Sequence, residues 1–268
     1  LQVDQYQLEA IPSAIWSTLS QAFVFSWRHA PNHDIRIAKF LVNGHTASGG
    51  TDSVTTTNAN NSVYNEGHVG AAGNLFGVHY NATENIWPYL TVLDPSGNVV
   101  GSPVALANNQ TGSNHWTALG GTRQGFVAFF DSPAGGVSEV FVPLLADGGG
   151  VALPSDAGDA GTLPGFNFSG SQSARFAFAV NDDTGGAGGV GLALIFLDHV
   201  AFAYVNADGL THVNPTLVFS HAYSAAGSEH WGTTLDMLGL TNIGGSFAVS
   251  LYSAAEQRTR IAASGCTQ

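Results

Sequence analysis

Three histidines occur in similar short segments that lie far apart in the sequence. Residues 113–116 (SNHW) and 228–231 (SEHW) repeat one pattern, and residues 65–68 (NEGH) keep the histidine without the tryptophan. Imidazole nitrogens are the commonest transition-metal ligands in proteins and suit copper, zinc, iron and nickel. We therefore expect a metal site with three nitrogen ligands, His68, His115 and His230, if the fold brings them together.

Carboxylate and amide side chains stand beside these histidines in the sequence. Glu66 or Glu229 could supply an oxygen ligand, and Asn114 or Glu229 could accept a hydrogen bond from the second ring nitrogen of a ligand histidine. No local spacing such as HExxH or CxxC occurs, so the site depends on the fold. The alternative is structural: the tryptophan packs between sheets and the histidine bonds a neighbouring carbonyl. Residues 13–16 (SAIW) keep the tryptophan without the histidine, as a packing role for the tryptophan allows.

The elements that would position these residues recur with a period of about 50 residues. Gly44, Gly97, Gly148 and Gly209 end Asx/Gly turns at intervals of 53, 51 and 61 residues, and Gly265 would end a fifth. Short runs rich in Phe and Val, bounded by Gly, Asn, Asp and Pro, are typical of strands. Before each turn lies such a run: 22–27, 75–80, 125–130, 191–198 and 246–252.

A repeat of this length that holds four strands is typical of a propeller blade. We predict an all-β fold, a five-bladed β-propeller that forms a single domain over residues 1–268. Residues 175–180 must then be the first strand of the fourth blade, and the fifth blade has only three strands of its own. Residues 2–10 (QVDQYQLEA) would supply its fourth strand and close the ring, which removes an exposed edge. A large β-sandwich is the alternative.

A radial arrangement of strands would gather the histidines at one mouth of the central channel. His68, His115 and His230 would lie at the starts of first strands. Trp27 and His29 would lie at the end of a second strand, which returns to the same face. Residues distant in the sequence would then surround a single axis.

Residues 27–29 (WRH) also carry a resemblance. The segment resembles the Trp-x-His element of the secreted copper-binding surface proteins of methane-oxidising bacteria. In that family two histidines hold copper(I) beside a tryptophan oxidised to kynurenine. The resemblance implies that Trp27 and His29 are ligands here, that His68 or His115 completes the site, and that copper is the metal.

The charge composition argues against several classes of partner. The chain has 7 Lys and Arg against 19 Asp and Glu, for a net charge of −12. Nucleic acids and anionic membranes both attract cationic surfaces, so we expect neither as a partner. A metal ion or a neutral small ligand such as a glycan suits this balance.

The single cysteine and the first residue bear on processing. Cys266 has no partner for a disulfide within the chain, so it is free or crosslinks to another chain. The sequence starts with Leu1 and lacks an apolar run of about 18 residues. We interpret the chain as a processed protein that is secreted or displayed at the cell surface.

We expect binding rather than catalysis. A glycosidase would need a set of carboxylates in the channel, and none can be singled out. The alternative function is a carbohydrate-binding lectin or adhesion module, with Trp87, Trp116 and Trp231 as exposed stacking surfaces. Residues 182–186 (DDTGG) indicate a turn, with a loose calcium loop as the alternative.

Overall fold

The computed structural model describes most strands of the chain and some of their connections. The described residues are 13–17, 21–29, 34–43, 46–48, 53–55, 68–82, 87–107, 116–132, 136–152, 161–162, 176–181, 188–196, 199–209, 212–220, 237–243, 245–253 and 257–265. They contain strands and turns without a helix, so none of them forms a helix with the length and apolar character needed to cross a membrane.

The strands form five small antiparallel sheets, which we number in chain order. Sheet 1 contains β1 (Ser13–Ser17), β2 (Ala22–His29), β3 (Asp34–Asn43), β4 (Thr46–Ser48) and β5 (Ser53–Thr55). Sheet 2 contains β6 (His68–Ala72), β7 (Leu75–Ala82), β8 (Trp87–Leu93) and β9 (Val104–Ala105). Sheet 3 contains β10 (Thr117–Gly121), β11 (Gly125–Asp131), β12 (Val137–Pro143) and β13 (Gly161–Thr162). Sheet 4 contains β14 (Phe176–Asn181), β15 (Val190–Ile195), β16 (His199–Val205) and β17 (His212–Ser220), and sheet 5 contains β18 (Met237–Ile243), β19 (Ser246–Ser253) and β20 (Arg258–Gly265).

Each sheet is built from strands that are consecutive in the chain, and some of their described connections are tight turns. In residues 94–97, the Asp94 carbonyl accepts a hydrogen bond from the Gly97 amide at 2.9 Å, and Gly97 has a φ of 91°. Because glycine adopts positive φ without steric cost, this turn reverses the chain after β8. The turns predicted at Gly148 and Gly209 also have positive φ, whereas Gly44 lies outside the described residues. The prediction of a fifth turn is wrong, because Gly265 is the last residue of β20 and pairs with Ser246.

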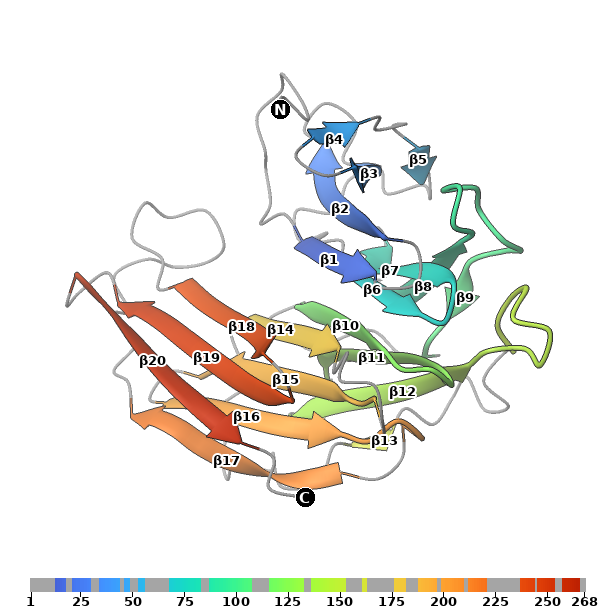
Figure 1. The fold of residues 1–268 in the computed structure, drawn as a ribbon. Coiled ribbons are helices and arrows are strands. Elements are labelled where there is room, and N and C mark those ends of the chain that lie inside the picture. Colours follow the sequence, from blue (N-terminus) through green and yellow to red (C-terminus); the bar gives the residue numbers. More distant parts are fainter. Residues whose placement is uncertain are drawn as a thin grey trace.

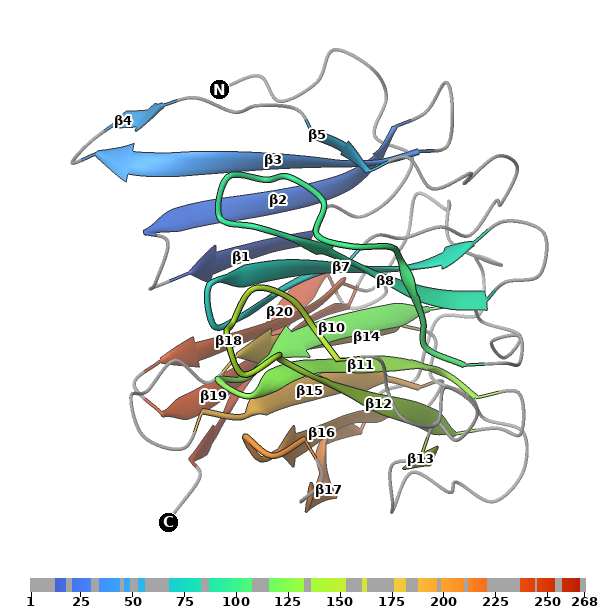
Figure 2. The same ribbon diagram turned by 90° about the vertical axis from the view of Figure 1, so that its right-hand side faces the viewer.

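The sheets follow one another in chain order and pack face to face. Figure 1 shows this order by colour, from blue sheet 1 to red sheet 5. The first strands of successive sheets contact each other, in the order β1, β6, β10, β14 and β18. Figure 2 shows sheets 1 to 4 one below another, with their long strands running in similar directions.

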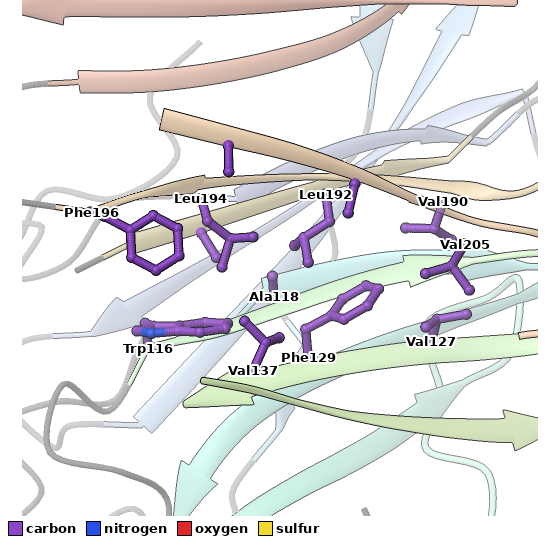
Figure 3. Packing of buried hydrophobic residues seen from close by; sticks show 13 residues of the cluster. Trp116, Ala118, Val127, Phe129, Val137, Val190, Leu192, Leu194, Phe196 and Val205 are labelled. Atoms are coloured by element: carbon purple, nitrogen blue, oxygen red, sulfur yellow. The ribbon is translucent and has the colours of Figure 1, made fainter. Parts of the chain in front are cut away.

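Four apolar layers join neighbouring sheets. The layer between sheets 3 and 4 is drawn in Figure 3, where Trp116 lies beside Val137 and Phe196 at one end of the cluster. Corresponding layers join sheets 1 and 2, sheets 2 and 3, and sheets 4 and 5. Trp116 therefore packs between two sheets, as the structural alternative for that tryptophan predicted.

Much of the predicted strand order is confirmed. The five runs rich in Phe and Val belong to β2, β7, β11, β15 and β19, which are the second strands of their sheets, and β14 is the first strand of sheet 4. Sheet 5 has three described strands, as expected. The described strands form five sheets and not the two of a β-sandwich. Closure of these sheets into a five-bladed ring stays a prediction, and residues 2–10 lie outside the described residues.

Candidate metal centre

Buried polar side chains gather at one end of the sheets. We call this end the strand-start face, because first and third strands begin there and second strands end there; the opposite end, where first strands turn into second strands, is the hairpin face. The Ser13 hydroxyl accepts a hydrogen bond from the Val69 amide at 3.2 Å, so the strand starts of sheets 1 and 2 adjoin. The polar residues buried at the strand-start face are Ser13, Ser26, His68, His79, Asn81, Thr117, Asp131, Ser132, Ser138, Glu139, His199 and Ser253.

Two imidazoles lie directly opposite each other at this face. His68 is the first residue of β6, and it pairs with His79 near the end of β7. Side chains at directly opposed positions of an antiparallel pair point to the same side of the sheet, with their Cβ atoms about 5 Å apart. Both side chains are buried, with 3% of His68 and none of His79 exposed.

The tight turn between β6 and β7 sets this pairing. Residues 73 and 74 connect Ala72 to Leu75, and Gly73 has a φ of 55°. A two-residue turn fixes the register of a hairpin. Counting back four residues from Ala72 and forward four from Leu75 reaches the two histidines.

The hydrogen bond of His79 defines its tautomer. Nδ1 of His79 lies 3.1 Å from the carbonyl oxygen of Ala118 in β10. Because a carbonyl oxygen only accepts hydrogen bonds, Nδ1 carries the proton and donates it. Nε2 therefore has a free lone pair, and it is buried without a hydrogen-bond partner among the described residues.

The electrostatic surroundings keep His79 neutral. Burial lowers the pKa of His79 to about 3, the hydrogen bond to Ala118 opposes this shift, and the neighbouring His68 adds to it. Aromatic rings surround the pair: Phe130 meets the ring of His79 edge-on at 6.0 Å, and Phe178 meets that of His68 at 6.1 Å. A neutral imidazole whose Nδ1–H is held by a carbonyl is the arrangement that metal-ligating histidines adopt.

Five of the predicted site residues lie in parts of the chain that the structure does not describe. His115, His230, Glu66, Glu229 and Asn114 lie outside the described residues, so their part in the site stays a prediction. Among the described residues, no group of three or more His, Cys, Asp and Glu side chains could hold a metal ion. The described part of the chain therefore offers one pair of imidazoles.

Trp27 lies on a different surface from His68. It is buried, and it forms a small cluster with Ala38 and Phe25. Val24 points to the opposite side of β2 and packs in the layer toward sheet 2, which contains His68. Trp27 and the layer between sheets 1 and 2 thus lie on opposite faces of β2. For His29 the described part is the backbone, which pairs with Asp34.

Sequence reasoning did not include His79 among the predicted ligands. The signal was present, because a two-residue Gly-Asn turn between apolar runs predicts the register that pairs His68 with His79. The repeated tetrapeptides led only to the histidines that lie within them, and His79 lies in none of these segments. His79 has no counterpart in the segments of His115 and His230.

One predicted ligand surface is wrong, and another stays open. Trp116 was expected as an exposed platform for a sugar, but only 1% of it is exposed, because it fills the layer between sheets 3 and 4. Trp87 is half-buried at the start of β8, and Trp231 lies outside the described residues. The predicted turn or calcium loop at residues 182–186 also lies outside them.

Comparison with known proteins gives similarities of structure alone. No protein-family model and no curated protein matches the chain. Among solved structures of propeller type, it is similar to a prolyl endopeptidase, with 11% identity and a TM-score of 0.44 over 97% of this chain, although it spans only 35% of the length of that chain. It is also similar to an endo-arabinase from Bacteroides thetaiotaomicron, with 12% identity, a TM-score of 0.43 and coverage of 100% of this chain and 98% of the other. The WD40 domain of SCAP from fission yeast has 11% identity and a TM-score of 0.40, with 91% of this chain and 61% of that chain covered.

Proposed function

We propose that this chain is a non-catalytic metal-binding protein whose site is built on His68 and His79. The observation that carries the proposal is the Nε2 lone pair of His79, which is buried, faces no described hydrogen-bond donor and belongs to a ring kept neutral by burial. Leaving a buried polar atom unsatisfied costs about 1–3 kcal/mol, and a bound metal ion would remove that cost. His68 lies opposite on the neighbouring strand and supplies a second imidazole.

Further donors come from the sequence pattern. In the sequence, His115 lies two residues before β10 and His230 seven residues before β18, the first strands of sheets 3 and 5, and one of them would add a third nitrogen. This part of the proposal rests on a five-bladed propeller closed by residues 2–10. The supporting observation is that the strand starts of sheets 1 and 2 already meet through Ser13 and Val69.

Copper in its monovalent state fits the described donors best. His79 is a neutral ligand, and the ring neighbours of the two histidines, Phe130 and Phe178, are apolar. Burying charge without a compensating partner is costly, so a single positive charge is easier to hold here than a double one. The resemblance of residues 27–29 to a secreted copper-binding family implies copper and a protein that is secreted or at the cell surface, but Trp27 lies on the face of β2 opposite the layer toward sheet 2 and adds no support for the site at His68 and His79.

Elemental analysis of protein purified without chelators or metal-affinity resin tests the proposal. We expect bound copper in the wild type and its loss in His68→Ala and in His79→Asn. Asparagine can still donate to the Ala118 carbonyl but lacks the second nitrogen, so His79→Asn separates metal binding from packing. His199→Asn is the matched control, because His199 is a buried histidine of sheet 4, stacked on Phe196. Copper that stays bound when both His68 and His79 are replaced would refute the site.

A further inference from the structure

The layer between sheets 2 and 3 contains polar side chains other than the two histidines. Phe130 packs in this layer, and its ring centroid lies 6.0 Å from that of His79. Phe130 is paired with Thr117 of β10 on one side and with Ser138 of β12 on the other. Because directly paired residues of antiparallel strands point to the same side of a sheet, the hydroxyls of Thr117 and Ser138 flank the Phe130 ring and face sheet 2.

Two more polar residues lie nearer the strand-start face on the same two surfaces. Asn81 follows His79 by two positions in β7, so its side chain points to the same side, because side chains alternate along a strand. The pairing of β11 with β12 continues to Ser132, whose amide donates to the Gly136 carbonyl at 3.3 Å, so Ser132 shares the side of Phe130. The four polar residues are buried, with at most 7% exposed: Asn81, Thr117, Ser132 and Ser138.

The carboxylates at this end of sheet 3 point away from the two histidines. Asp131 is paired with Val137, which packs in the layer toward sheet 4 (Figure 3). Glu139 is paired with Phe129 of the same layer, so both carboxylates face sheet 4. Strands β6 to β9 of sheet 2 contain no Asp or Glu. The described strands that form this layer therefore surround the histidines with hydroxyl and amide groups and with no negative charge.

A copper(I) ion held by His68 and His79 would add a positive charge to this layer. Imidazole ligands carry no negative charge, so they leave the charge of the ion uncompensated, and a buried uncompensated charge is costly. Hydroxyl and amide groups can donate hydrogen bonds, and such bonds are strong when the acceptor is an anion. A monovalent anion beside the metal would neutralise the site and accept hydrogen bonds from these donors.

We infer that the metal at His68 and His79 also binds a small monovalent anion of the halide class, which accepts hydrogen bonds from the hydroxyls of Thr117 and Ser138. The inference rests on the proposed function, because the metal supplies the positive charge that attracts the anion. A halide fits both partners of the site. Soft ligands favour copper(I), and chloride and bromide are softer than water or a carboxylate. A spherical halide also accepts hydrogen bonds from donors on several sides.

A carboxylate of the chain is the competing source of negative charge. Glu66 precedes His68 by two residues, lies outside the described residues and was predicted as an oxygen ligand. If Glu66 held the metal, the charge would be compensated within the chain and the metal would need no halide. Glu66→Gln separates the two sources, because it removes the negative charge and keeps the size of the side chain.

X-ray absorption at the copper edge tests the inference. Copper(I)-loaded protein in a halide-free buffer is titrated with bromide, a heavy scatterer whose bond to copper is distinct from that of an imidazole nitrogen. We expect copper–bromide scattering in the wild type. Its absence at every bromide concentration, or its appearance in Glu66→Gln alone, would overturn the inference and leave the proposed function intact. A wild type that takes up no copper would overturn both.

Removal of single hydroxyls provides the second measurement. We expect Thr117→Val and Ser138→Ala each to raise the bromide concentration at half-saturation about tenfold, because each removes a hydrogen bond to a charged group. The copper edge reports only on protein that holds copper, so this midpoint does not depend on copper loading. Thr91→Val is the matched control: Thr91 is buried, and its hydroxyl lies 3.3 Å from that of Tyr80, which packs toward sheet 1. Equal midpoints in Ser138→Ala and Thr91→Val would contradict the inference.

Discussion

The hairpin face and the strand-start face differ in how fully their buried polar groups are hydrogen-bonded. At the hairpin face, the Asn181 side chain accepts from the Gly121 amide at 2.7 Å and donates to the Ala71 carbonyl at 2.8 Å, which ties sheets 2, 3 and 4 together. The Thr122 hydroxyl lies 2.9 Å from the Ala207 carbonyl and accepts from the Gln124 amide. These bonds satisfy backbone groups where three sheets converge.

At the strand-start face, the histidine pair is held but incompletely satisfied. His79 donates to Ala118, and its second nitrogen has no hydrogen-bond partner among the described residues. Structural clamps use every polar atom they bury, because an unsatisfied one is costly. The hairpin face thus maintains the fold, and the contrast supports the proposal that the strand-start face holds a ligand.

The largest expected loss of stability comes from a substitution that forces two strands apart at the hairpin face. A Cβ on Gly121 would collide with the Ala71 carbonyl of β6, so two backbones would have to separate. We expect Gly121→Val to lower the free energy of unfolding by about 4 kcal/mol, measured in urea. Gly101→Ala is the control, since Gly101 has a φ of 72° with nothing near its Cβ position, and backbone strain alone costs about 1 kcal/mol. Equal losses would show that the close approach is not what requires glycine.

The next effect removes the clamp but leaves the backbone in place. Asn181→Ala abandons the Gly121 amide and the Ala71 carbonyl in a buried position. We expect a loss of about 3 kcal/mol, from about 1–3 kcal/mol for each abandoned group. Copper content should not change, because the clamp lies at the hairpin face. A loss below about 0.5 kcal/mol, the usual surface effect, would contradict the clamp.

A smaller effect appears as a pH dependence of the metal-free protein. The unfolded chain protonates His79 near the ordinary histidine pKa of 6.5, whereas the folded chain does so only near a pKa of about 3. Between these values the unfolded state binds more protons, so stability falls as pH falls, by about 1.4 kcal/mol per pH unit. We expect this slope in urea unfolding of the wild type and a slope smaller by one proton in His79→Asn. Identical slopes would mean that His79 is protonated in the fold.

The sequence predicted the local structure better than the assembly. The turn at residues 94–97 and the second strands rich in Phe and Val are local signals, since Gly at positive φ and alternating apolar residues determine them. The burial of Trp116 was foreseen only as an alternative, because exposure depends on the neighbouring sheet.

The candidate site was predicted in part for a similar reason. His68 stands at a strand start as expected, and the turn arithmetic could have found its partner. The hydrogen bond from His79 to Ala118 joins residues 39 positions apart, so it depends on how sheet 2 packs on sheet 3. That packing selects the tautomer, and with it the nitrogen that we propose holds a metal.

X-ray absorption of copper-loaded protein under reducing conditions tests the central claim most directly. The account predicts a monovalent copper edge and scattering from imidazole nitrogens in the wild type and in His199→Asn, and the loss of this signal in His79→Asn. A spectrum that is the same in the wild type and in His79→Asn would contradict it, because the metal would then be held elsewhere.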